Sequence, residues 1–200
     1  MAAASAPVGW GRLPAVSWLR VRAFTRHRVL AVLAFPTALL SLTPSVIRRA
    51  AHETADRNGL VVFGRYRPVA DALASIAVTV PVVLLGMVAA LFVALSDPLG
   101  AVLVLAALLG GAVGAGALLV GTPLTAAVGA ETPPGRRWTV TALSQRPGTR
   151  LSALLATREL LTTVPAGGVV VAVAAEERLA DSYSRLGSSR GRDLRVFRQV

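Results

Sequence analysis

The sequence has no cysteine and no lysine, and it is poor in histidine and in aromatic residues. Without cysteine the chain forms no disulfide, no thiolate zinc site and no thiol nucleophile. Its two histidines, His27 and His52, lie far apart in sequence, so we expect no metal site. Aromatic residues make up 5% of the chain, and no basic run is interleaved with them. This pattern argues against a nucleic-acid partner.

Charged residues are also scarce, at 16%, whereas hydrophobic residues reach 54% and the mean hydropathy is +0.63. A soluble domain has roughly 45–50% apolar residues, so the composition favours insertion into a lipid bilayer. The formal net charge is +11, and every one of the 21 basic residues is arginine. Basicity of this kind, without stacking rings beside it, does not indicate nucleic-acid binding.

Three apolar runs follow one another along the chain. The first, 29–47, is just long enough to cross a bilayer, but Pro36 and Pro44 predict a kinked helix that either crosses or dips in and returns. The second and third, 75–95 and 99–121, carry no formal charge and are separated by three residues. They predict a tight transmembrane hairpin.

Arginine counts predict the orientation of this hairpin. Its tip holds Asp97 and no arginine, whereas arginines flank it on both sides, which predicts a cytoplasmic C-terminal tail on a multi-pass protein of the cell inner (cytoplasmic) membrane. Small residues in 110–116 favour close helix pairing and a homodimer, unless they reflect only the abundance of glycine and alanine in this chain. The absence of ionisable residues from both runs disfavours a transporter or channel.

The predicted fold class is therefore a membrane α-helical protein, with two transmembrane helices as a hairpin and one further proline-containing candidate, plus a small cytosolic α/β tail. The predicted parts are a basic N-terminal arm (1–28), a transmembrane or re-entrant helix (29–47), a polar linker (48–74), the hairpin (75–121), a second linker (122–137) and the tail (138–200). The arm is either a membrane-surface segment, with Trp10, Trp18 and Phe24 at the headgroups, or an unstructured basic tail.

Periodicity in the tail predicts a strand, a helix, a strand, a helix and a strand. Residues 138–144 alternate as a strand does, and the leucines of 150–164 lie on one helical face. The apolar run 169–175 is typical of a strand covered on both faces. A short helix over 176–187 and an alternating strand over 194–200 complete the unit.

From about residue 136 to residue 200 the chain resembles the C-terminal half of the GNAT acyl-CoA N-acyltransferases. The matching segments are "SQRPGTRLSALL" and "VVVAVAAEERLADSYSRLGSS". That family has a strand, a glycine-rich loop that opens a helix, an apolar strand, and a helix containing a tyrosine followed by Leu-Gly-Phe. The resemblance implies a tail that is half of a GNAT fold, acetyl-CoA as cofactor and an amine as acyl acceptor; it implies no metal. We find no counterpart of the family's N-terminal half in the sequence.

The glycine loop before the tail's first helix is the predicted cofactor site. A helix N-terminus offers unpaired N–H groups and a positive dipole end, which suit the pyrophosphate of coenzyme A. Arg150 departs from the family's pattern, which has Gly or Ala there, and an ordinary strand-to-helix turn is the alternative. The predicted cofactor-binding residues are Leu143, Ser144, Gln145, Arg146, Gly148, Thr149, Arg150 and Ser152.

Tyr183 is the predicted catalytic residue. The resemblance implies that its phenol donates a proton to the departing coenzyme A thiolate; the alternative is a core aromatic that only packs. Ser188 departs from the family's phenylalanine, and no general base is predicted. Two functions remain open at this point: a membrane-anchored acetyl-CoA-dependent N-acetyltransferase, and a non-enzymatic membrane scaffold or partner subunit. The lipid bilayer is the partner in both.

Overall fold

The computed structural model describes most of the chain outside the third apolar run. The described residues are 5–25, 27–95, 97, 99–100, 102, 104, 132–149, 152–174, 177–185, 187–191 and 194–200. Most of the predicted 99–121 span therefore lies outside the described residues. So do the small-residue face at 110–116, most of the 122–137 linker, and Arg150.

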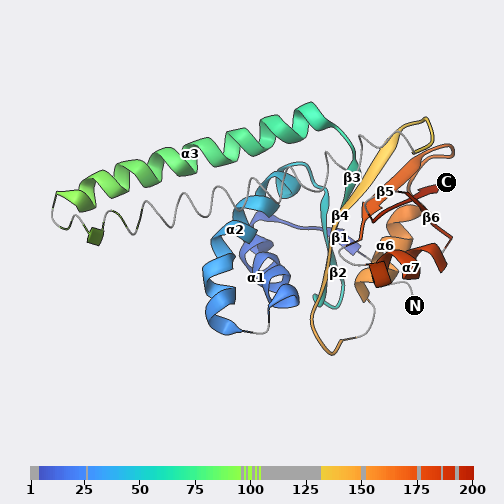
Figure 1. Cartoon of the computed structure of the whole chain (residues 1–200), viewed down its shortest axis with the longest axis horizontal. Helices are drawn as coiled ribbons and strands as arrows, with labels where there is room; N and C mark the ends of the chain where they lie inside the picture. Colours follow the sequence, from blue (N-terminus) through green and yellow to red (C-terminus); the bar gives the residue numbers. More distant parts are fainter. Residues whose placement is uncertain are drawn as a thin grey trace.

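A seven-stranded mixed β-sheet forms the centre of the molecule (Figure 1), with strand order β1-β2-β3-β4-β5-β7-β6. The pairs from β1 to β4 are antiparallel, β4 and β5 are parallel, and β5, β7 and β6 are again antiparallel. The strands are β1 (Ser5–Pro7), β2 (Ala51–Thr54), β3 (Gly59–Arg65), β4 (Arg137–Gln145), β5 (Val169–Val173), β6 (Ser189–Arg190) and β7 (Arg195–Gln199).

This sheet corrects the predicted fold class. The prediction of a membrane α-helical protein with a small separate tail is wrong, because the first 65 residues supply three of the seven strands. β3, placed by the prediction within the polar linker 48–74, pairs with β4 from Gly59↔Gln145 to Arg65↔Trp138. The strand, helix, strand, helix, strand order predicted for the tail is confirmed, but the tail is one side of a larger α/β domain.

Two helices cover one face of the sheet: α1 (Leu13–Phe24), which follows a 3-10 turn at Trp10–Arg12, and α2 (Arg28–Ile47). α2 buries a stripe at helical spacing, including Ala31, Ala38 and Leu42, against α1 and the sheet. A helix over 29–47 is therefore confirmed, and it packs on α1 and the sheet. Its length and apolar composition also suit a membrane span, so its location in a bilayer stays a prediction.

The opposite face carries α6 (Ser152–Leu161) and α7 (Glu177–Arg185). Ala153, Ala156 and Leu160 of α6 pack on β3, β4 and β5, in a cluster with Val61 and Val170. α7 packs at the far side of this face, where its buried Ala180 contacts Ala174 and Val196. The two helices thus lie over the parallel strands and their neighbour β7.

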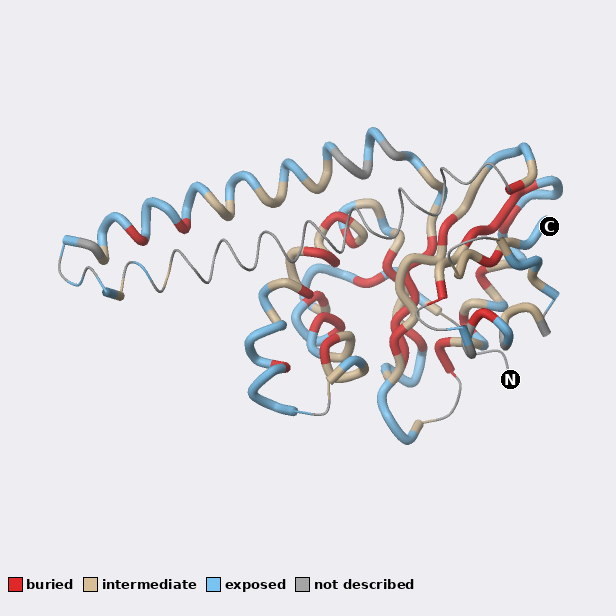
Figure 2. Tube along the Cα trace, in the orientation of Figure 1, coloured by how far each residue is buried: buried red, intermediate tan, exposed pale blue. Residues whose placement is uncertain are grey.

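Between β3 and β4 the chain leaves the sheet as the long helix α3 (Pro68–Ala94). It projects from the sheet (Figure 1), and most of its side chains are exposed (Figure 2). Leu73–Val93 has a mean hydropathy of 2.7 and is 11% buried. The helix predicted for 75–95 is confirmed, whereas its location in a bilayer stays a prediction. We call the segment between β3 and β4 the apolar insertion. It leaves and rejoins the sheet at neighbouring points, because the Tyr66 N–H donates to the Arg137 carbonyl at 2.9 Å.

Candidate functional site

The parallel strands β4 and β5 separate part of the way along the sheet. Their pairing runs from Arg137↔Val169 to Val140↔Ala172. β4 then continues to Gln145 paired with β3, while β5 continues beside β7. The carboxyl ends of parallel strands are where α/β sheets bind ligands. Past Val140, β4 therefore has a backbone edge on its β5 side without a β5 partner.

A β-bulge lies at the point of separation. Val62 pairs with Ala142 and Phe63 pairs with Val140, so Thr141 is the extra residue in β4. A bulge rotates the local peptide groups and side chains out of the regular alternation. Here it changes the direction of β4 at the residue where the strand leaves β5.

A cavity of about 510 Å³ opens beside these strands, within the range of small-molecule sites. Its wall is mostly apolar, and the polar side chains in it include Arg158, Tyr183 and Arg198. β4, β5 and β7 form its floor, and α6 and α7 form its sides. The lining residues are Val140, Leu143, Leu154, Leu155, Thr157, Arg158, Leu161, Val170, Ala172, Tyr183, Ser188, Val196 and Arg198.

Tyr183 reaches this cavity from α7. Its ring is half-buried and packs near Ala172 and Val196. Burial raises the pKa of the Tyr183 phenol, so the hydroxyl carries its proton at neutral pH. The Ser188 N–H donates to the Tyr183 carbonyl at 3.2 Å, which keeps the end of α7 against the cavity wall. The two interpretations of this residue are compatible, because the ring packs and also lines the cavity.

The loop after β4 is braced by Gln145. Its Nε2 donates to the Thr149 carbonyl at 3.0 Å, and its Oε1 accepts from the Ala153 N–H at 3.4 Å. Gly148 has φ +78°, a left-handed conformation that favours glycine, and a Cβ built on it meets no atom within 4 Å. The loop is therefore held from within by a side-chain amide and is open above its glycine.

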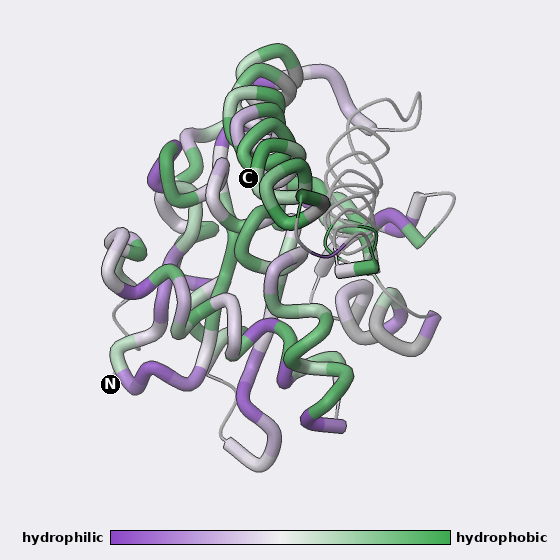
Figure 3. The backbone as a smooth tube through the Cα atoms, turned by 90° about the vertical axis from the view of Figure 1, so that its left-hand side faces the viewer, coloured by the Kyte–Doolittle hydropathy of each residue, from purple (hydrophilic) through white to green (hydrophobic). Residues whose placement is uncertain are grey.

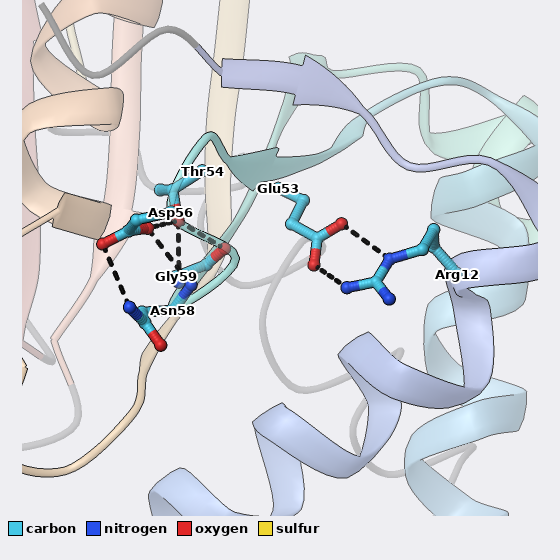
Figure 4. A network of polar contacts seen from close by, with 6 residues as sticks. All are labelled: Arg12, Glu53, Thr54, Asp56, Asn58 and Gly59. Atoms are coloured by element: carbon cyan, nitrogen blue, oxygen red, sulfur yellow. Dashed lines mark hydrogen bonds and ion pairs between the residues drawn. The ribbon is translucent and has the colours of Figure 1, made fainter.

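The β2–β3 turn supports the same loop from the side (Figure 4). The Thr54 hydroxyl donates to the Asp56 carboxylate at 2.6 Å and accepts from the Gly59 N–H at 2.8 Å, and the Asn58 N–H donates to Asp56 at 3.1 Å. The hydrogen bond from Thr54 lowers the pKa of Asp56, more than burial raises it. The Asn58 carbonyl accepts from the Arg146 N–H at 2.8 Å. The turn and the loop thus form one connected surface.

Gly59 brings α6 close to this turn. A Cβ at Gly59 would lie 2.8 Å from Thr54 Cγ2 and 3.0 Å from Ala153 Cβ, so no larger residue fits. The first turn of α6 therefore sits directly against the β2–β3 turn. Nothing in our sequence analysis pointed to this contact, although the "DRNG" turn at 56–59 was visible as a turn signal.

The structure separates the predicted cofactor residues into groups. Leu143 lines the cavity; Gln145, Arg146, Gly148 and Thr149 form the loop; and Ser152 is buried at the start of α6. Ser144 pairs with Leu60 and shares the face covered by α1 and α2, so its side chain points away from the cavity. That side chain is almost fully buried, and its hydroxyl has no hydrogen-bond partner among the described residues.

The α1 face carries a different polar contact. Arg12 binds both carboxylate oxygens of Glu53, at 3.1 Å and 2.6 Å, and so joins the start of α1 to β2 (Figure 4). Two-pronged pairing of this kind fixes orientation as well as adding energy. Because α1 covers the face opposite the cavity, we assign this pair to the fold. Among the described residues, no three His, Asp or Glu side chains gather as metal ligands do.

Comparison with known proteins gives no relative from which a function could be read. No protein-family model, curated protein or solved structure matches the chain. Tyr183 and the loop were predicted from the sequence, whereas Arg158 and Arg198, two cations in the cavity wall, were not. No motif in the sequence marks either arginine: Arg158 lies on α6 and Arg198 on β7, and both line the same cavity.

Proposed function

We propose that the chain is a membrane-attached acyl-CoA-dependent N-acyltransferase whose acyl donor lies in the cavity between β4, β5, α6 and α7. One observation carries the proposal: the separation of β4 from β5 opens into a cavity with a half-buried, protonated tyrosine in its wall. The resemblance of residues 136–200 to the GNAT acyltransferases gives that arrangement its chemical interpretation.

The complete sheet supports the proposal. A tail of about 65 residues buries only a marginal core by itself. β3 adds Val61 and Phe63 to the apolar cluster under α6. The core on which α6 packs is therefore built from both halves of the chain. The cavity therefore belongs to a domain with its own core.

The residues of the site fit an acyl-CoA. The open glycine loop at the start of α6 suits a pyrophosphate, with Arg146 exposed beside it. Past Val140, the edge of β4 presents backbone groups that can pair with an extended arm containing amides, as an added strand does. Arg158 and Arg198 supply positive charge in the cavity wall. The bound donor would supply an activated acyl thioester.

Tyr183 supplies the proton. In acyl transfer to an amine, a C–N bond forms, the C–S bond breaks, and the leaving sulfur needs a proton. The phenol of Tyr183 is protonated at neutral pH, as a tyrosine ordinarily is, and burial raises its pKa further. From the cavity wall this group can protonate the leaving sulfur, while the amine gives up its own proton to solvent.

Titration calorimetry with acetyl-CoA on the full chain in detergent tests the binding step. We expect saturable heat for the wild type and none for Ala172→Phe, which fills the cavity floor. Ala166→Phe is the matched control, because Ala166 is exposed outside the cavity and its variant should bind as the wild type does. Absence of heat from the wild type at high micromolar acetyl-CoA would exclude the proposal.

Tyr183→Phe tests the chemical step. The chain has no cysteine, so release of coenzyme A thiol from acetyl-CoA in the presence of a panel of amines can be followed with a thiol reagent without background. We expect the rate to fall about a hundredfold while affinity is unchanged. Tyr66→Phe, at the chain's other tyrosine, is the control and should keep the wild-type rate. A loss of affinity in Tyr183→Phe would make the tyrosine structural.

Membrane attachment through α3 is part of the same proposal. The apolar window Leu73–Val93 is 21 residues long, enough to cross the hydrocarbon core, and little of it is buried by the protein. A reporter fused after Val200 should be active only inside the cell, with the α/β domain on the cytoplasmic side. Activity of the reporter outside the cell would show that the α/β domain lies on the opposite side of the membrane and would contradict this orientation.

A further inference from the structure

The connected ends of α1 and α2 expose a cluster of large apolar side chains. We call this cluster the α1–α2 tip; it consists of Phe24, Val29, Leu30, Val32 and Leu33. Phe24 is 71% exposed, Val29 73% and Leu33 70%, whereas Ala31 between them is fully buried. The first turns of α2 therefore bury one narrow stripe and present apolar groups elsewhere. Soluble monomers seldom expose a patch of this kind, and it marks an interaction site.

The charge around the α1–α2 tip is of one sign. Residues 20–33, which include the α1–α2 tip, contain four arginines and no aspartate or glutamate. His27 and Arg28 are exposed beside the α1–α2 tip. Apolar groups rimmed by cations are the pattern of a segment that lies in the headgroup layer of an anionic bilayer.

Trp18 extends this surface onto α1. It is 39% exposed, and its ring meets Phe35 of α2 edge to face, with the ring centroids 6.0 Å apart. This contact holds the two helices together at a site where a tryptophan is partly in contact with solvent. Tryptophan with one apolar side and one wet edge is typical of membrane interfaces.

The α1–α2 tip projects on the side of the sheet from which α3 also extends (Figure 1). α2 contacts α3, and both helices lie away from the sheet on the same side of the molecule (Figure 1). Viewed from that side, apolar segments of both helices face the reader (Figure 3). A bilayer crossed by α3 would therefore meet this side of the domain.

We propose that the α1–α2 tip docks on the headgroup layer of a bilayer that contains anionic lipid, and so fixes the domain's orientation beside α3. A second copy of the chain is a poorer occupant, because two such surfaces would bring their arginines together. Docking goes beyond acyl transfer, and its test gives an answer whether or not the protein transfers an acyl group.

The cysteine-free chain allows a single spin label to be placed at will. We place one at Leu33→Cys, in the α1–α2 tip, and one at Ala55→Cys, an exposed residue of the β2–β3 turn, as control. The full chain is reconstituted in vesicles of phosphatidylglycerol and phosphatidylcholine. The collision rates of each label with oxygen and with a water-soluble nickel chelate are then measured. We expect the oxygen-to-nickel ratio at residue 33 to exceed that at residue 55 severalfold.

Two further measurements separate the bilayer from other occupants. The ratio at residue 33 should fall when phosphatidylcholine alone is used, and also when Arg28→Glu is added to the labelled chain. A ratio equal to that of the residue 55 control in anionic vesicles would overturn the proposal. So would spin–spin broadening at residue 33 that disappears on dilution with unlabelled chain, since that would identify a second copy as the occupant. Circular dichroism of both labelled chains and of Arg28→Glu verifies that they fold alike.

Discussion

Removal of the apolar insertion should leave a soluble, folded domain. Because the Tyr66 N–H donates to the Arg137 carbonyl at 2.9 Å, a four-residue glycine-containing turn can replace residues 67–136 and join β3 to β4 directly. The deleted segment holds α3, of which Gly86 and Ala90 are the buried residues among those whose side chains are described. Little packing is therefore lost.

The expected change in the free energy of unfolding follows from loop length. Shortening a flexible connection from 70 residues to four lowers the closure cost by about 2.5 kcal/mol. The lost contacts between α2 and α3 oppose part of this gain. The free energy of unfolding of the excised chain should therefore equal or exceed that of the α/β domain in the full chain. The increase should be no more than about 2.5 kcal/mol.

Expression without detergent, size-exclusion chromatography and urea unfolding followed by circular dichroism make up the assay. The excised chain should run as a compact species, unfold cooperatively and bind acetyl-CoA as the full chain does. The same excision carrying Leu60→Asp, a charge in the core, is the control and should be insoluble. If the excised chain without that change is also insoluble or lacks strand signal, the sheet depends on the insertion and the reasoning fails.

Three smaller predictions concern the fold around the site. Gly168→Ala should lower the free energy of unfolding by about 1–3 kcal/mol in urea melts, because a Cβ there would lie 2.7 Å from Trp138 Cζ3. Leu60→Ala, at a fully buried position, should cost about 2–5 kcal/mol in the same assay. Asp56→Ala should destabilise the domain at pH 7 by less than about 1.5 kcal/mol. Since the folded-state pKa of Asp56 is lowered, its stabilisation is present above the ordinary value of 3.8 and is lost as pH falls through the folded-state pKa. Melts of wild type and Asp56→Ala should therefore converge in acid, and a constant difference would contradict this account.

Local pattern was enough to predict the elements of residues 137–200 except the two-residue strand β6, because each of the others has a clear period and clear ends. It does not decide where α2 lies, since a core helix and a membrane span of this length share the same composition. β3 was missed for a different reason. Its apolar residues lie between charged segments, and its partner β4 follows only after 71 further residues, so no local signal records the pairing.

The part of the candidate site that depends on a single side chain in a helix could be predicted from the sequence. The part that depends on the register of β4 could not. Tyr183, the predicted catalytic residue, lines the cavity. Ser144 was predicted to bind the cofactor because the segment "SQRPGTRLSALL" resembles the cofactor loop of the GNAT acyltransferases. The bulge at Thr141 reverses the alternation, so Leu143 faces α6 and Ser144 faces α1. A one-residue irregularity of this kind has no signature in the sequence.

The register of β3 on β4 also bears on how the chain is made. β3 is complete at Arg65, but its partner ends at Gln145, 80 residues later. At about 5–20 residues per second, the ribosome delivers that partner roughly 4–16 s afterwards. Throughout this interval one edge of a strand with five buried residues has no neighbour and can pair with other chains. The nascent chain is thus most vulnerable to aggregation while the apolar insertion is being synthesised, and early capture of that insertion by the membrane would shorten its exposure.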